Sequence, residues 1–129
     1  MATDKAPHWK QFERLAERIF AELLPFAQVT WNDHLLGQHS MRRRQIDVSI
    51  RAQVSGQPIL SIVQAKDTSE AVDIGVVDAF ASVVRDVRAT KGILICRSGF
   101  DRTVYTYARS AGIELLTEVR VIAGAQTVA

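Results

Sequence analysis

The stretch QIDVSIR, residues 45–51, alternates polar and apolar side chains without a break. A period of two puts successive side chains on opposite faces of a β-strand, so we expect Ile46, Val48 and Ile50 to share one face. Asp47 lies in the middle of this strand, where aspartate is disfavoured and where a carboxylate is costly if it is buried without a partner. Asp47 is therefore the first candidate functional residue.

A second strand is predicted downstream, over residues 59–66. The turn-forming sequence Ser55-Gly56-Gln57-Pro58 separates it from the first strand, which favours an antiparallel hairpin. Gln64 and Lys66 end the second strand, and because they are two residues apart they project from the same face. We expect the hairpin to bring a carboxylate, an amide and an ammonium group together at one end of a sheet.

The rest of the chain alternates between helices and strands. Apolar spacing and turn residues delimit six further elements: helices over about residues 8–24, 74–89 (capped by Asp73) and 101–111, and strands over 27–31, 92–96 and 113–116. Residues 32–43 are polar and predict a loop. The element order, α-β-β-β-α-β-α-β, predicts an α/β fold. Its mixed sheet of about five strands begins antiparallel, continues parallel and carries helices on both faces.

Length and composition favour one globular domain. A chain of 129 residues with 47% hydrophobic side chains can bury one core, so we expect a single domain over residues 1–129 with its core at about 9–117. No apolar run is long enough to cross a membrane and no signal peptide is evident, so we expect a cytoplasmic protein. Cys96 cannot form an internal disulfide and lies in an apolar run typical of buried residues.

A run of three arginines, Arg42-Arg43-Arg44, precedes the strand that carries Asp47. The formal net charge is only +2, so any argument for nucleic-acid binding rests on local clusters such as this run. A solvated surface explains an arginine run equally well. Composition alone leaves both interpretations open.

The predicted grouping of Asp47, Gln64 and Lys66 suits phosphodiester hydrolysis. A hard cation such as Mg²⁺ prefers oxygen ligands, which Asp47, Gln64 and the backbone carbonyl of Ala65 could supply. Such a metal would polarise the phosphate and lower the pKa of an attacking water. Lys66 would orient that water or offset charge on the phosphorus. A structural alternative, which spacing alone favours, is a simple ion pair between Asp47 and Lys66 with Gln64 exposed on the strand.

Glu13 lies at the border of the apolar face of the first predicted helix, next to Phe20 on a helical wheel. From this border its side chain can point past the core toward the end of the sheet. An ordinary boundary residue of an amphipathic helix would occupy the same position, and periodicity alone favours that interpretation.

These motifs, in this order and at this spacing, resemble the PD-(D/E)XK nucleases, and within them the Mrr-like group of restriction endonucleases. The likeness extends from about Trp9 to Thr117. The matching segments are Phe12-Glu13, Gln45-Ile46-Asp47, Val63-Gln64-Ala65-Lys66, Val76-Val77-Asp78-Ala79-Phe80, and Gly92 to Phe100 followed by Ala108 and by Gly112-Ile113-Glu114-Leu115.

The resemblance implies a restriction-endonuclease-like fold and metal-dependent cleavage of the DNA backbone, with Mg²⁺ as the cofactor and Mn²⁺ as a substitute. It makes Asp47, Gln64 and Lys66 the core of the site and Glu13 an auxiliary acidic group. It also makes phosphate contacts the natural use of Arg42-Arg43-Arg44, which would lie near the scissile strand. Most members of the superfamily carry a carboxylate where this chain has Gln64, although the Mrr-like group tolerates the glutamine.

Two alternatives stay open under this resemblance. The neutral amide of Gln64 should weaken Mg²⁺ binding, which favours a catalytically inactive DNA-binding or partner-binding module of the same fold. A Holliday-junction-resolvase-like nuclease, which works as a dimer on branched DNA, shares the same core. Sequence specificity would require a separate subunit or domain, and cutting both strands suggests a homodimer.

Overall fold

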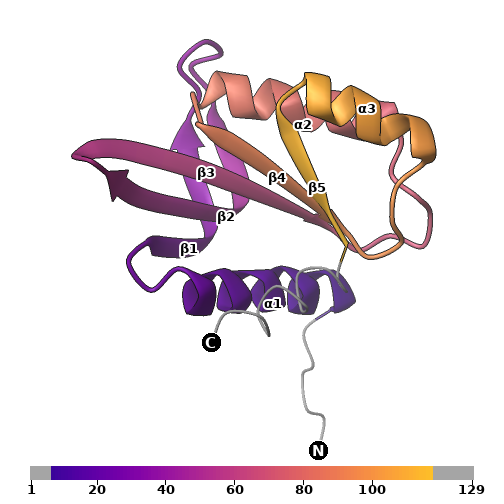
Figure 1. The fold of residues 1–129 in the computed structure, drawn as a ribbon, viewed down its shortest axis with the longest axis horizontal. Coiled ribbons are helices and arrows are strands. Elements are labelled where there is room, and N and C mark those ends of the chain that lie inside the picture. The colour runs from indigo at the N-terminus through magenta and orange to yellow at the C-terminus, as the bar shows by residue number, and fades with distance from the viewer. Residues whose placement is uncertain (1–6, 118–129) are drawn as a thin grey trace, which may run out of the picture.

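The computed structural model describes residues 7–117 of the chain (Figure 1). Its helices and strands follow the order predicted from the sequence. They are α1 (His8–Leu23), β1 (Gln28–Leu36), β2 (Arg43–Val54), β3 (Gln57–Lys66), α2 (Ile74–Asp86), β4 (Lys91–Cys96), α3 (Arg102–Ser110) and β5 (Ile113–Leu116).

The five strands form one mixed sheet in the order β1-β2-β3-β4-β5. The pairs β1–β2 and β2–β3 are antiparallel, whereas β3–β4 and β4–β5 are parallel. Figure 1 shows α1 on one face of the sheet and α2 and α3 on the other. The predicted mixed α/β architecture is confirmed.

Each face of the sheet has its own apolar core. On the α1 face, helix residues at a spacing of three and four meet alternate residues of the central strands. This core contains Phe12, Ala16, Ile19, Phe20, Val48, Ile50, Val63, Ala65, Ile93 and Ile95. The core on the opposite face, under α2 and α3, includes Ile46, Ile62, Val77, Phe80, Leu94, Cys96, Val104, Ala108, Ile113 and Leu115. Cys96 is buried, as predicted.

Local turn and cap residues act largely as the sequence predicts. The side chain of Asp73 accepts a hydrogen bond from the backbone N–H of Val76 at 3.2 Å and so caps α2. The β2–β3 turn is shorter than expected, because it consists of Ser55 and Gly56 alone, both with positive φ. Within residues 7–117, no helix is both long and apolar enough to span a membrane.

The first hairpin is longer than predicted. Residues 32–36 and Arg43, which we expected in a loop, belong to strands, and pairing continues from Asp33↔Ile46 to Leu36↔Arg43. The loop prediction was wrong here because an antiparallel ladder is held by backbone hydrogen bonds. Polar side chains exposed on its surface therefore do not prevent it from forming.

This hairpin also bends. β2 pairs with β3 only as far as Val48↔Val63, and Asn32, opposite Asp47, has a φ of +53°. Beyond this point residues 33–46, here called the arm, leave β3, and the loop at their tip lies beside the end of α2 (Figure 1). Ile46 consequently joins the core under α2, whereas Val48 and Ile50 face α1. The prediction that these three residues share one face was wrong because the bend interrupts the alternation.

Candidate active site

Asp47 lies at the fork where β2 separates from β3. It directly precedes Val48, which makes the last pair with β3. The Oδ2 atom of Asp47 accepts a hydrogen bond from the backbone N–H of Ala65 at 2.9 Å. The carboxylate thus replaces the strand partner that β2 no longer gives to Ala65. Burial raises the pKa of Asp47, although this hydrogen bond and the charge of Lys66 act in the opposite direction.

The backbone of Ala65 faces the space between β3 and the part of β2 that separates from it. In a β-strand the N–H and C=O groups of one residue point to the same side, and those of the next residue point to the other. The carbonyl of Lys66 accepts a hydrogen bond from the N–H of Arg97, just beyond β4, at 3.2 Å. The carbonyl of Ala65 is therefore directed away from β4, toward the side where Asp47 lies.

Gln64 and Lys66 approach Asp47 in different ways. Gln64 and Asp47 line a pocket of about 110 Å³ between β2, β3 and α2, together with Gln45, Ile46, Val63, Phe80 and Val83. Lys66 lies near enough for its charge to lower the pKa of Asp47. None of the ion pairs between described residues joins Lys66 to Asp47, so the geometry does not favour the simple ion-pair alternative.

Helix α1 places Glu13 close to Asp47. The side chain is buried, and its Oε1 atom accepts a hydrogen bond from the indole Nε1 of Trp31 at 3.2 Å. Burial and then the negative charge of Asp47 raise the pKa of Glu13 to about 7, while the hydrogen bond from Trp31 acts against this rise. Glu13 is thus a buried carboxyl group coupled to Asp47, rather than an ordinary boundary residue.

Trp31 is a residue of this site that the sequence did not indicate. Besides its bond to Glu13, its ring lies under two cations, with Lys10 Nζ 5.4 Å and Arg14 Cζ 4.5 Å from the ring centroid. A tryptophan in a half-buried strand usually signals packing alone. Only the contact with Glu13, 18 residues away in the chain, reveals its place in the site.

The donor set fits a hard divalent cation. Asp47 and Glu13 are two neighbouring carboxyl groups, both with a raised pKa, and a cation held at Asp47 would favour the ionised form of each. Across residues 7–117 no three His, Cys, Asp or Glu side chains gather as a metal-binding group. Neutral oxygens, such as the Gln64 amide and the Ala65 carbonyl, would have to complete the ligand set.

Comparison with known proteins identifies the family. The sequence profile of the Mrr_cat restriction endonuclease family matches residues 5–123. The chain belongs to this restriction endonuclease family. It falls within the Mrr-like group of the PD-(D/E)XK nucleases, as the sequence motifs predicted. No curated protein sequence matches the chain.

Several solved structures share the fold of this Mrr-like domain. The protein of unknown function AF1548 is 17% identical with a TM-score of 0.70, and the match covers 91% of this chain and 64% of AF1548. MspJI restriction endonuclease in complex with a 27-mer oligonucleotide is 19% identical (TM-score 0.60; 91% of this chain, 27% of MspJI). The DNA modification-dependent restriction endonuclease AspBHI is 22% identical (TM-score 0.58; 89% of this chain, 30% of AspBHI). The chain therefore spans less than two thirds of the length of each of these structures.

The three arginines of the Mrr-like domain are not equivalent. Arg42 is exposed in the loop of the arm and Arg43 is exposed at the start of β2, and no ion pair between described residues involves either of them. Arg44 lies 3.3 Å from Asp86 through its Nη1 atom, and its side chain is only 26% exposed. Arg42 and Arg43 are thus available to an external anion, whereas Arg44 already has an internal partner.

Proposed function

We propose that this domain is an endonuclease that hydrolyses DNA phosphodiester bonds with a divalent cation, Mg²⁺ or Mn²⁺ in its place. The observation that carries the proposal is the fork between β2 and β3, where Asp47 lies close to Glu13 and Lys66 and shares a pocket with Gln64. Membership of the restriction endonuclease family supports the reaction. The oligonucleotide-bound MspJI and the DNA modification-dependent AspBHI support DNA as the substrate.

Each residue has a role that follows from its position. Asp47, Gln64 and the carbonyl of Ala65 would hold the cation, which when bound polarises the scissile phosphate and lowers the pKa of a water. Lys66 places a positive charge beside Asp47 and offsets negative charge on the phosphate as the new bond forms. Glu13, with a pKa of about 7, can hold or accept a proton near neutral pH, and Trp31 fixes its orientation.

Cleavage of a supercoiled plasmid tests the proposal. We expect cutting that requires Mg²⁺ or Mn²⁺, and Asp47→Ala and Lys66→Ala should each lower the rate at least about a hundredfold, as loss of a transition-state contact does. Lys91→Ala is a matched control. Lys91 begins β4, at the end far from Lys66, which pairs with the last residue of that strand, and its side chain forms an ion pair with Glu114. Robust cleavage by both Asp47→Ala and Lys66→Ala proteins would overturn the mechanism.

A catalytically inactive DNA-binding or partner-binding module is the second candidate. It is favoured by the neutral amide of Gln64, which leaves the site with less negative charge for a metal. Calorimetric titration with Mn²⁺ separates the two candidates: we expect binding to the native domain and equal or tighter binding to Gln64→Glu, which restores a charge. DNA binding without any uptake of a divalent ion would favour the module. Loss of both metal binding and cleavage in Gln64→Glu would mean that Gln64 does not face the ion.

The cellular setting of the domain belongs to the same proposal. We infer a cytoplasmic protein that acts as a homodimer when it cuts both strands, with sequence specificity supplied by a separate subunit or domain. The 27% and 30% coverage of MspJI and AspBHI supports the last point, because most of those chains lies outside the shared fold. Parallel assays on linear duplex and on four-way junctions test the Holliday-junction-resolvase-like alternative.

A further inference from the structure

One carboxylate holds the tip of the arm, residues 37–42, against the end of α2. The Oδ1 atom of Asp86 accepts hydrogen bonds from the backbone N–H groups of His39 at 3.0 Å and Ser40 at 2.9 Å. Its Oδ2 atom accepts a hydrogen bond from the Ser40 hydroxyl at 2.6 Å and lies 3.3 Å from Arg44 Nη1. Both oxygens of Asp86 are therefore engaged by the arm.

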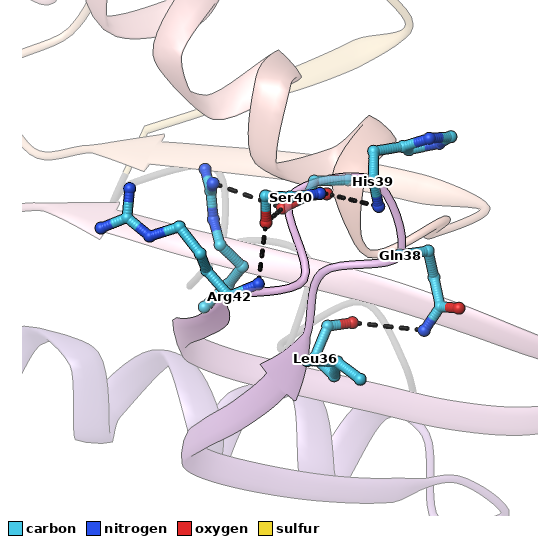
Figure 2. Close-up of polar contacts among 7 residues, drawn as sticks. Leu36, Gln38, His39, Ser40 and Arg42 are labelled. Carbon is cyan, nitrogen blue, oxygen red and sulfur yellow. Dashed lines mark hydrogen bonds and ion pairs between the residues drawn. The ribbon is translucent and has the colours of Figure 1, made fainter.

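Backbone contacts also hold the tip of the arm against the end of α2. The carbonyl of Asp86 accepts a hydrogen bond from the N–H of Gln38 at 2.7 Å. Within the loop, the Ser40 hydroxyl also accepts a hydrogen bond from the N–H of Arg42 at 3.1 Å (Figure 2). Gly37 lies so close that a Cβ atom there would overlap with Oδ2 of Asp86. The contacts of Ser40, His39 and Arg44 lower the pKa of Asp86 to about 2, so the carboxylate is charged at neutral pH.

The helix that carries Asp86 also forms a wall of the candidate site. Phe80 and Val83 line the pocket that contains Asp47 and Gln64, and Asp86 follows Val83 by about one helical turn. Gln45 and Ile46, at the base of the arm, line the same pocket. Contacts between Asp86 and the arm tip therefore fix two walls of the pocket relative to each other.

The outer side of the arm tip carries groups suited to phosphate. Arg42 is exposed, and Figure 2 shows the ring of His39 pointing away from the bonded loop. Arg43 is the next exposed residue, at the start of β2. These two guanidinium groups, which form no ion pair with any described residue, lie at and just after a loop whose backbone is held in place. They match the repeating negative charges of a DNA strand.

We propose that Asp86 is a positioning residue, which fixes the arm so that Arg42 and Arg43 contact the DNA backbone beside the site. Arg44 acts with Asp86 in holding the arm and does not contact DNA. This inference rests on the proposed function, because it takes DNA as the ligand and the pocket at Asp47 as the place of reaction.

The test compares two pairs of variants of the full chain. Arg42→Gln and Arg43→Gln should each weaken binding to duplex DNA and reduce the slope of log K against log salt by about 1. Neither should alter hydrogen exchange at the amides of His39 and Ser40. Arg44→Gln should leave the salt slope close to that of the native domain, because Arg44 does not contact DNA. Asp86→Ala should weaken binding to duplex DNA, because it releases the arm that presents Arg42 and Arg43 to the phosphates. Asp86→Ala should speed exchange at both amides about tenfold, since it removes their charged acceptor.

Cleavage kinetics add a readout that a merely structural effect would not produce. Asp86→Ala should lower kcat as well as raise KM, because the arm also forms a wall of the catalytic pocket. Asp86→Asn should recover much of the loss, since its amide oxygen can still accept both backbone hydrogen bonds. If Asp86→Ala does not fold, Ser40→Ala removes the hydroxyl that bonds to Asp86 and to the N–H of Arg42 at the exposed tip, but it leaves both backbone hydrogen bonds to Asp86. It should shift exchange and kcat in the same direction by a smaller amount.

Three results would overturn the inference: unchanged exchange at His39 and Ser40 in Asp86→Ala, a salt slope in Arg44→Gln that falls as in Arg42→Gln, or no binding of DNA by the native domain. If the native domain binds DNA and never cuts it, the proposed nuclease function is contradicted but the role of Asp86 is not. In that case the salt slopes and the exchange rates still decide the role of Asp86.

Discussion

Two carboxyl groups at this site are held in places that oppose their ionisation. Glu13 lies on the buried side of α1, close to Asp47, and burial and then the charge of Asp47 raise its pKa from an ordinary 4.5 to about 7. Burial also raises the pKa of Asp47. Without a metal, the folded domain therefore holds protons that the unfolded chain releases, and its stability must depend on pH.

The direction of this dependence follows from the raised pKa of Glu13. Its stabilising contribution is fully present below about pH 4.5 and is lost as the pH rises through about 7. In a chelator, the free energy of unfolding should fall by about 1–2 kcal/mol between pH 5 and pH 8, and Glu13→Gln should flatten this fall. Urea unfolding of both proteins at pH 5 and pH 8 measures this fall in the free energy of unfolding. Equal pH dependence in the native and Glu13→Gln proteins would remove Glu13 as the cause.

At the scale of elements, the arm is the part of the fold that the sequence did not predict. Alternation and turn residues predict each strand and helix from local sequence, and the order of these elements then predicts the mixed sheet. The bend at Asn32 and Asp47 depends on a positive φ and on a side chain that replaces a backbone partner. Neither feature leaves a periodic pattern, so the different face of Ile46 could not be predicted. The loop prediction holds for residues 37–42 and failed only for residues 32–36 and Arg43, where exposed polar side chains cover a backbone ladder.

The same limit applies to the site. Asp47, Gln64 and Lys66 could be predicted as neighbours because they lie on adjacent strands of one hairpin. Trp31 could not be linked to Glu13, and Asp86 could not be linked to Ser40, because 18 and 46 residues separate the members of these pairs. Contacts that distant are set by tertiary packing, which local periodicity does not encode.

Substitutions at two tightly packed glycines, Gly37 in the arm and Gly92 in β4, test the arm and the core separately. A Cβ atom at Gly37 would overlap with the carboxylate of Asp86, and one at Gly92 would overlap with Val84. Alanine at either position should lower the free energy of unfolding by about 1–3 kcal/mol. Only Gly37→Ala should also weaken DNA binding, because Gly92 lies at the start of β4, at the opposite end from Lys66. Equal DNA affinity in Gly37→Ala and Gly92→Ala would mean that the arm takes no part in DNA binding.

At the scale of the whole molecule, residues 7–117 form one sheet with one fork and therefore one candidate site. Under the proposed function, we expect a single site of this kind to break one strand in each encounter, so that cutting through a duplex takes two copies. We expect plasmid nicking to increase in proportion to protein concentration and linear DNA to increase roughly with its square. Sedimentation at the same concentrations should show a monomer that dimerises as linear product appears.

Linear DNA as the first product at the lowest concentrations, with a monomeric protein, would mean that one copy cuts both strands. The second site would then have to lie outside the fork formed by β2 and β3.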